Sequence, residues 1–292
     1  MFFRQEHPSW NVEGRDWPHR DASRFVEAGG LRWHVQQAGD GPVLLLLHGT
    51  GAATHSWRGV LPLLARHFTV IAPDLPGHGF TAMPASAGLS LRGMAGLVDA
   101  LLQKLGLRPV IAVGHSAGAA ILVTMAIQGL ARPERIISLN GALLPMRGAG
   151  LFGPLARLLF VNPLAPRIFS WRAEDIRATR RLLEGTGSRI DAAGVEFYAR
   201  LFRKSGHVAA TLGMMANWEL DWLEGKLPRL DIPLLLVAGT KDKAVPAAQS
   251  RDLAARILGA RLVEIEGGHL VHEETPEAVA ELIRAEAGRG GR

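Results

Sequence analysis

The chain has 292 residues, of which 48% are hydrophobic and 21% are charged, so it can build a packed core and is not a disordered chain. It contains no cysteine, which excludes disulfide bonds, a cysteine nucleophile and cysteine-ligated zinc. The formal charge of +6 would suit a carboxylate-bearing substrate or an anionic lipid surface, but no nucleic-acid-binding signature accompanies the arginines, so nucleic acid is not an expected partner.

The first 22 residues are polar but hold Trp10 and Trp17, which predicts an arm that packs across the domain. The beginning of the chain lacks the apolar core of a signal peptide, and no uninterrupted apolar stretch is long enough to span a bilayer. We therefore expect a cytoplasmic protein.

From residue 23 the sequence alternates between short apolar runs and longer amphipathic segments. Gly29-Gly30 predicts a two-residue hairpin, and the fully apolar run at 43–47 fits a strand buried on both faces. The predicted strands are 24–28, 31–38, 43–47, 69–72, 110–113, 135–139, 234–237 and 261–265, and the predicted helices are 57–66, 91–105, 119–128, 249–258 and 276–287. This alternation predicts an α/β fold with a mostly parallel sheet flanked by helices.

The alternation stops between residues 142 and 226, where Gly and Pro punctuate helix-like apolar pieces such as 151–161 and no strand is evident. An interruption of this size inside an α/β pattern predicts an inserted helical cap. The expected organisation is an arm at 1–22, a core at 23–141 and 227–287, the cap at 142–226 and a tail at 288–292.

A single serine stands in the spacing G-x-S-x-G at 114–118, between a predicted strand and a predicted helix. A serine on so tight a turn takes a strained backbone conformation, and a side chain at either glycine would collide with the neighbouring elements. Ser116 would then be exposed at a helix N-terminus, where amides and the helix dipole stabilise negative charge. Taken alone, the pentapeptide fits an ordinary glycine-rich turn equally well.

Two further residues turn this pattern into a candidate catalytic triad. Serine needs a base, and the base needs an orienting acid. Asp242 follows the predicted strand 234–237, and His269 follows the predicted strand 261–265. Because the carboxyl ends of parallel strands meet at one edge of a sheet, Ser116, Asp242 and His269 are expected to converge there.

Other polar residues compete for these roles. His272 is an alternative base, but the Gly-Gly before His269 and its distance from the strand end favour His269. Asn140 ends an earlier strand, yet its amide cannot balance the charge of an imidazolium, which favours Asp242. His115 adjoins the nucleophile but would face elsewhere, so packing is its simpler role, and His78 between two glycines fits a loop-stabilising role.

The same geometry predicts an oxyanion hole. One donor would be the backbone amide of Ala117, directly after the nucleophile, and the other the amide of Thr50 in the loop after 43–47. The histidines lack a helical H-x-x-x-H spacing or a supporting carboxylate cluster, so no metal site is expected and no cofactor is implied.

These residues resemble the α/β-hydrolase superfamily over essentially residues 23–287. The likeness rests on the runs His48-Gly49-Thr50-Gly51, Asp74-Leu75-Pro76-Gly77-His78-Gly79, Gly114-His115-Ser116-Ala117-Gly118 and Gly267-Gly268-His269, and on Asp242. The motifs are specific for the superfamily and nearly silent about substrate.

A narrower resemblance is to the magnesium chelatase accessory proteins of bacteriochlorophyll biosynthesis, the BchO type. It rests on Trp17-Pro18-His19-Arg20, Ser23-Arg24-Phe25-Val26, Gly30-Leu31-Arg32-Trp33-His34-Val35-Gln36 and the run from His48 to Arg58. It implies a photosynthetic bacterium, a role near the insertion of magnesium into protoporphyrin IX, and magnesium chelatase subunits as partners.

A porphyrin is a broad apolar disc with carboxylates at one edge, so its site would need apolar and aromatic walls with arginine at the rim. The predicted cap supplies Phe152, Phe160, Phe169, Trp171, Met214, Met215 and Trp218, with Arg167, Arg172, Arg177, Arg180 and Arg181 nearby. Among substrate-contacting residues we place His48, Gly49, His115, Trp171, Met214, Met215 and Trp218. The alternative is that the apolar residues fix the cap to the core and the arginines form a solvated face.

Three functional hypotheses follow. The first is a serine hydrolase that acts on an apolar, tetrapyrrole-like substrate in pigment synthesis. The second is a non-catalytic porphyrin-binding or chelatase accessory protein. The third is an esterase or carbon–carbon bond hydrolase unrelated to pigment. An exposed apolar cap face, for instance around 155–161, would also permit weak peripheral association with a membrane.

Overall fold

The structure is a computed structural model that describes residues 5–145, 162 and 164–290. Eight strands form one sheet in the order β1-β2-β4-β3-β5-β6-β7-β8. The strands are β1 (Ser23–Ala28), β2 (Leu31–Ala38), β3 (Val43–Leu47), β4 (Thr69–Pro73), β5 (Ile111–His115), β6 (Arg135–Leu139), β7 (Leu234–Gly239) and β8 (Arg261–Ile265). The predicted strands and the mostly parallel α/β fold are confirmed.

The direction of the strands determines where polar loops can meet. β1 and β2 pair as an antiparallel hairpin, and β2 joins β4 in antiparallel fashion. From β4 to β8 every neighbouring pair is parallel. The carboxyl ends of β3, β5, β6, β7 and β8 therefore lie along one edge of the sheet, the edge at which α/β proteins bind ligands.

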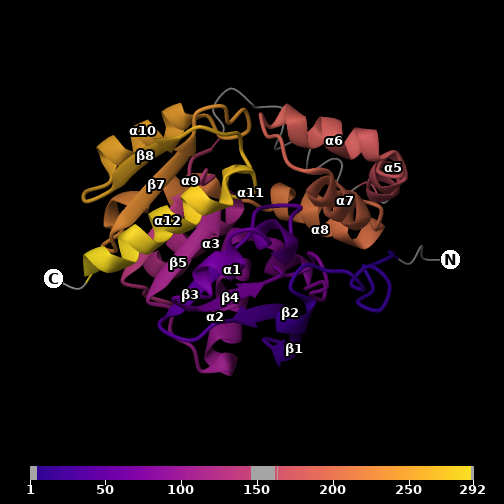
Figure 1. Cartoon of the computed structure of the whole chain (residues 1–292), viewed down its shortest axis with the longest axis horizontal. Coiled ribbons are helices and arrows are strands. Elements are labelled where there is room, and N and C mark those ends of the chain that lie inside the picture. The colour runs from indigo at the N-terminus through magenta and orange to yellow at the C-terminus, as the bar shows by residue number, and fades with distance from the viewer. Residues whose placement is uncertain (1–4, 146–161, 163, 291–292) are drawn as a thin grey trace.

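The sheet is covered on both faces, as its four consecutive leucines illustrate. Leu45 and Leu47 pack into one apolar cluster with residues of α2 (Leu91–Leu105), α3 (Ala117–Ile127) and α10 (Ala247–Arg256), whereas Leu44 and Leu46 pack into a second cluster with residues of α1 (Leu61–Leu64) and α12 (Pro276–Ala287). This alternation is the two-residue period of a strand buried on both sides. Figure 1 shows the helices arranged around the sheet.

Local signals fix the helix boundaries. The hydroxyl of Ser90 accepts from the amide of Gly93 at the start of α2, and Gly106 ends that helix in a left-handed conformation. The predicted helix at 57–66 is instead a short 3-10 turn, η2 (Thr54–Trp57), followed by α1, whose first turn carries Pro62. Further elements are η1 (Arg20–Ala22), η3 (Ser86–Leu89), η4 (Leu227–Arg229), α11 (Val271–Glu274) and η5 (Gly288–Gly290).

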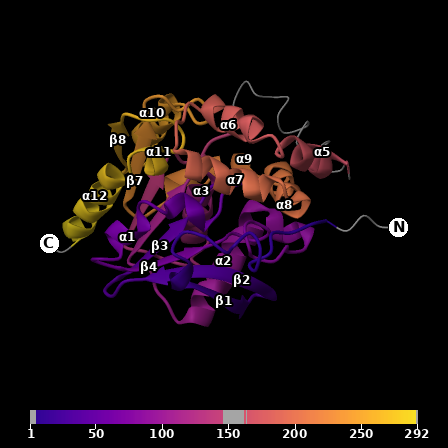
Figure 2. The ribbon, with the colours of Figure 1, turned by 45° about the vertical axis from the view of Figure 1, so that its right-hand side comes forward.

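A helical region is inserted between β6 and β7. Its described helices, which we call the inserted helices, are α5 (Ala165–Arg172), α6 (Ile176–Gly185), α7 (Ala192–Phe202), α8 (Ser205–Ala216) and α9 (Leu220–Glu224). Figures 1 and 2 show α5 to α8 grouped beyond the sheet. The part of this region that the structure describes contains no strand. The predicted apolar piece at 151–161, with Phe152 and Phe160, lies outside the described residues.

The chain before β1 packs between the core and the inserted helices. The indole of Trp17 is almost fully buried and donates to the Thr54 hydroxyl at 2.9 Å. The arm also reaches the inserted helices, because the Gly206 amide at the start of α8 donates to the Glu6 carbonyl at 2.8 Å. These contacts tie residues far apart in sequence into one packed unit.

Candidate active site

Ser116 occupies the sharp turn between β5 and α3. Its φ of 50° and ψ of −115° are a conformation that residues other than glycine seldom adopt. A Cβ on Gly118 would stand 2.2 Å from the Leu47 carbonyl oxygen, and one on Gly114 would stand 2.4 Å from the Ala119 nitrogen. The two glycines are therefore required by close backbone approach, as the spacing predicts.

His269 and Asp242 meet at the same edge of the sheet. Asp242 lies three residues beyond β7 and His269 four residues beyond β8, and the distance from His269 Nδ1 to Asp242 Oδ2 is 2.8 Å. The other carboxylate oxygen accepts from the amides of Ala244 and Val245, each at 2.8 Å. The acid is thus held on both oxygens.

This geometry sets the proton arrangement of the imidazole. An ionised carboxylate only accepts, so the Nδ1 atom of His269 must carry the hydrogen that it donates to Asp242. Nε2 then keeps its lone pair in the neutral ring. Such a histidine can take a proton from a hydroxyl and return it to a leaving group.

The candidate oxyanion donors lie on either side of the nucleophile. Ala117 is the first residue of α3, and the loop after β3 runs close to the turn, since a Cβ on Gly49 would stand 3.0 Å from Cβ of Ser116. Among the described residues neither the Ala117 amide nor the Thr50 amide donates a hydrogen bond. Both are therefore available to an oxygen that develops negative charge.

Asp74 supports the loop at residues 48–53 that follows β3 and carries Thr50, which we call the oxyanion loop. The sequence did not reveal this role. Its fully buried carboxylate accepts from the Thr54 amide at 2.7 Å, the Phe80 amide at 2.9 Å and His34 Nδ1 at 2.8 Å. Burial opposes ionisation, but the pKa of Asp74 is held well below its ordinary value by His34, by the nearby His48 ring and by the Phe80 amide. The only feature of the sequence that could have indicated this role is that Asp74 directly follows a buried strand.

His48 bonds two loops of the site through its ring nitrogens, and its predicted contact with a substrate stays a prediction. It is fully buried, its Nδ1 donates to the Gly49 carbonyl at 2.8 Å, and its Nε2 accepts from the Leu75 amide at 2.8 Å. Both ring nitrogens are therefore occupied by the loops on either side. His78 is likewise buried and bonds the Pro76 carbonyl, in line with a loop-stabilising role.

His115 and His272 pack beside the candidate base. His115 is buried and its Nε2 donates to the carbonyl of His269 at 2.8 Å, and its predicted contact with a substrate stays a prediction. The His272 ring is also buried, with its centroid 4.4 Å from that of His115. Burial lowers the pKa of His272 to about 3, so the ring is neutral at physiological pH.

The inserted helix α8 reaches the oxyanion loop through two side chains. Met214 is fully buried, and the Thr50 hydroxyl donates to its sulfur at 3.4 Å. His207, which the sequence reasoning missed, donates from Nε2 to the Gly51 carbonyl and accepts at Nδ1 from the Gly79 amide, both at 3.1 Å. Met214 thus lies beside Thr50, and its predicted contact with a substrate stays a prediction.

The remaining predicted substrate contacts differ from Met214. Trp171 on α5 is 72% exposed and Met215 on α8 is 42% exposed. Trp218 is half-buried and packs against the core cluster around α2 and α3. Of the arginines, Arg177 and Arg181 pair with Asp175 on the surface. These placements favour structural and solvated roles.

A buried ionic group links α7 to the segment that follows His269. Arg58 bonds Glu273 on α11 and lies 2.8 Å from Asp191, the N-cap residue of α7. The Tyr198 hydroxyl donates to Glu273 at 2.8 Å. Burial raises the pKa of Glu273 to about 7 against the opposing charge of Arg58. The group fastens the inserted helices to the core next to the candidate base.

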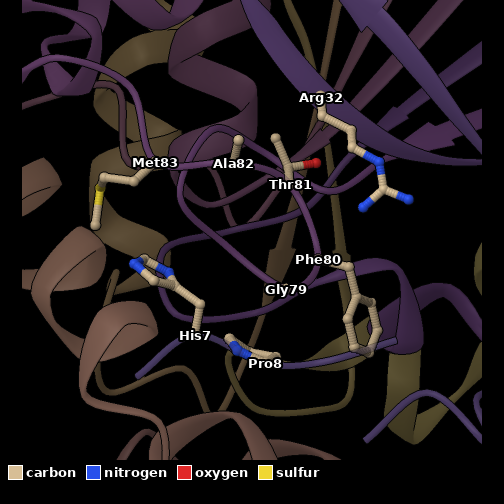
Figure 3. A pocket seen from close by; sticks show the side chains of 8 residues that line it. All are labelled: His7, Pro8, Arg32, Gly79, Phe80, Thr81, Ala82 and Met83. Carbon is tan, nitrogen blue, oxygen red and sulfur yellow. The ribbon is translucent and has the colours of Figure 1, made fainter. Parts of the chain in front are cut away.

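One surface cavity of about 260 Å³ lies away from these residues. Figure 3 shows His7 and Pro8 of the arm among the residues that line it, together with Arg32, Phe80 and Met83. Ser116, Asp242 and His269 do not line it. Within the described part of the chain, no group of three His, Asp or Glu residues is arranged for a metal ion, and no helix is both long and apolar enough to cross a bilayer.

The comparison with known families agrees with this architecture. A model of the alpha/beta hydrolase family matches residues 44–282, which include every residue of the candidate site. The chain belongs to the alpha/beta hydrolase family. It is 41% identical over 276 residues to the magnesium-chelatase 30 kDa subunit of Rhodobacter capsulatus, covering 92% of this chain and 95% of that protein.

Other proteins are similar at lower identity. The 2-hydroxy-6-oxo-6-(2'-aminophenyl)hexa-2,4-dienoic acid hydrolase of Metapseudomonas resinovorans is 30% identical, with 76% of each chain covered. An alpha/beta hydrolase fold protein from Burkholderia ambifaria superimposes with a TM-score of 0.76 at 26% identity, covering 90% of this chain and 97% of that one. The family and fold are thus established over nearly the whole chain.

Proposed function

We propose that this protein is a serine hydrolase that cleaves an ester or related acyl bond of an apolar, tetrapyrrole-like substrate, at or near the magnesium chelatase step of bacteriochlorophyll biosynthesis. The observation that carries the hydrolytic part is the bond between His269 Nδ1 and Asp242, at the sheet edge where Ser116 stands on its strained turn. The similarity to a magnesium-chelatase 30 kDa subunit supports the pathway.

In the proposed reaction His269 accepts a proton and then returns it, first as the acyl-enzyme forms and again as water hydrolyses it. The Ser116 oxygen attacks the acyl carbon while its proton passes to His269 Nε2, and Asp242 stabilises the imidazolium. The Thr50 and Ala117 amides hold the oxyanion. Collapse breaks the bond to the leaving group, which takes the proton from His269 and leaves an acyl-enzyme. Water then attacks the acyl carbon with His269 as base and releases Ser116 and the carboxylic acid.

Labelling by a fluorophosphonate probe tests the hydrolytic part. The full-length protein should be labelled, and Ser116→Ala should lose the label because the probe bonds the nucleophilic oxygen. Ser138→Ala, a buried serine on β6, is the matched control and should label like the original protein. Absence of labelling in folded protein, together with no turnover of short or long acyl esters, would refute a serine hydrolase.

The second candidate is a porphyrin-binding chelatase accessory protein that does not use its serine, because the name of the Rhodobacter capsulatus relative describes a chelatase subunit. Fold and triad residues alone do not establish hydrolysis. A Ser116→Ala strain with normal pigment beside a pigment-deficient deletion strain would favour this candidate, as would an unchanged Soret shift when Ser116→Ala protein is titrated with protoporphyrin IX. Normal pigment in the deletion strain would favour an unrelated esterase.

A further inference from the structure

Asn140 is placed where it can control the candidate base. It follows β6 directly, is almost fully buried, and has a positive φ of 46°. Its Nδ2 donates to the carbonyls of Gly268 and His269, at 2.9 and 2.8 Å. Its Oδ1 accepts from the Gly239 amide at 2.6 Å. The side chain therefore spans from β6 to the loops after β7 and β8.

The chemistry of the site selects asparagine. Only one orientation of its amide satisfies two carbonyls and one N–H at once. An ionised aspartate would turn an acceptor toward both carbonyls, and an aliphatic residue would remove a hydrogen-bond partner from all three buried main-chain groups. Asparagine also tolerates a positive φ better than most side chains. Asn140 thus meets a backbone demand and a hydrogen-bonding demand together.

A second side chain donates to the carbonyl oxygen of His269. The carbonyl oxygen of His269 also accepts from His115 Nε2 at 2.8 Å, and His115 directly precedes Ser116. Burial keeps the pKa of His115 well below its ordinary value, so the neutral ring keeps this N–H. One carbonyl is therefore fixed from the end of β5 and from the end of β6.

The acid loop is joined to the same group. The Gly239 amide is held by Asn140, and the Gly239 carbonyl accepts from the Asp242 amide at 3.1 Å. The Lys241 amide in turn donates to the Gly267 carbonyl at 2.8 Å. Through these bonds the main chain that carries Asp242 and the main chain that carries His269 are set relative to each other.

We propose that Asn140, assisted by His115, is a positioning residue that fixes the main chain of His269 relative to Ser116 and Asp242. The inference rests on the proposed serine hydrolase function. Asn140 does not touch the reacting atoms, so its loss lowers the rate by displacing the imidazole rather than by weakening substrate binding. A displacement of about 1 Å in such an arrangement reduces rates on the order of 100-fold.

The test compares rates of fluorophosphonate labelling and of p-nitrophenyl butyrate hydrolysis in full-length protein. Asn140→Asp keeps the shape of the side chain but removes the two N–H donors of Nδ2. It should slow labelling on the order of 100-fold, and it should lower kcat by a large factor while KM changes little. His115→Phe keeps a buried ring and should slow labelling on the order of tenfold. Ser138→Ala, on β6 two residues before Asn140, should match the original protein in rate and pH profile.

The outcomes separate the two proposals. If the original protein is folded and unlabelled, the hydrolase proposal fails and the positioning role falls with it. If the original protein labels and folded Asn140→Asp labels within about threefold of it, with the same pH profile, only the positioning role is overturned. Should Asn140→Asp fail to fold, His115→Phe decides, and labelling by that variant at the original rate overturns the inference.

Discussion

At the scale of single residues, the site depends on buried polar groups that are held by hydrogen bonds from main-chain amides and from histidine rings. Asp74 is the clearest case, because its carboxylate joins the Thr54 and Phe80 amides to His34 beneath the oxyanion loop. A buried charge of this kind is stabilising only while each partner is present. The loop geometry that the proposed catalysis requires is therefore linked to the stability of the fold.

Replacing Asp74 with alanine should lower the free energy of unfolding at pH 7 by about 3–5 kcal/mol, because it leaves two buried amides without an acceptor. The folded-state pKa of Asp74 is depressed, so this stabilisation is present above its ordinary pKa and is lost as the pH falls below it. Urea unfolding at pH 7 measures the difference. Asp40→Ala, at an exposed turn, is the control, and a loss below about 1 kcal/mol for Asp74→Ala would contradict the argument.

At the scale of elements, α8 is the inserted helix that contacts the catalytic edge most directly. His207 bonds the Gly51 carbonyl in the oxyanion loop and the Gly79 amide after β4, and Met214 lies against Thr50. The inserted helices are thus joined to the loop that would hold the oxyanion. Movement of α8 would move a donor as well as a wall of the site.

His207→Phe should preserve the packing of α8 while removing both hydrogen bonds. We expect a loss of about 1–3 kcal/mol in the free energy of unfolding and faster amide exchange at Gly79, since that N–H loses its acceptor. Urea unfolding and hydrogen exchange measure these effects. Met215→Ala alters an exposed residue of the same helix and should change neither, and unaltered Gly79 exchange in His207→Phe would show that the bond is not maintained in solution.

At the scale of the whole molecule, the fold buries an unusual set of neutral histidines around the sheet edge. The pKa is lowered by burial at His48, His55, His78, His115, His207 and His272. The pKa of His207 falls to about 4 and that of His272 to about 3. The pKa shift of Glu273 is opposite to that of the histidines. It rises to about 7, so near neutral pH the folded state binds a proton there that the unfolded state does not.

The protein should therefore lose stability as the pH falls from 7 to 5. Unfolded histidines bind protons near pH 6.5 while the buried ones do not, so their contribution is complete above pH 6.5 and declines below it. Glu273 offsets one of these protons. We expect the free energy of unfolding, measured in urea at pH 7, 6 and 5, to fall by roughly 5–10 kcal/mol.

A matched pair of variants tests the origin of this pH dependence. His272→Phe removes a ring whose two nitrogens have no partner among the described residues, and should reduce the slope by about 1.4 kcal/mol per pH unit. His67→Gln, at an exposed position, should leave the slope unchanged. A fall below about 2 kcal/mol in the original protein between pH 7 and pH 5 would show that the buried histidines do not govern its acid stability.

The sequence by itself determined the order of strands and helices, the turn at Ser116, and the positions of Asp242 and His269 beyond strand ends. Apolar period and glycine spacing are local properties, and parallel strands then bring loop residues to one edge whatever their separation in sequence. The predicted helix at 57–66 was misplaced, because the structure has a 3-10 turn at Thr54–Trp57 and a short helix at Leu61–Leu64 that carries proline in its first turn.

Only the tertiary structure decided which polar residues lie inside and which apolar residues of the inserted helices face solvent. An apolar stripe on a helix has the same spacing whether it covers a core or forms a surface. The sequence therefore predicted the same role for Met214 and Trp171, whereas Met214 is fully buried and Trp171 is largely exposed. The roles of Asn140, His207 and Glu273 likewise depend on partners more than 70 residues away. Hydrogen bonds between distant segments are set by packing, and no local pattern encodes them.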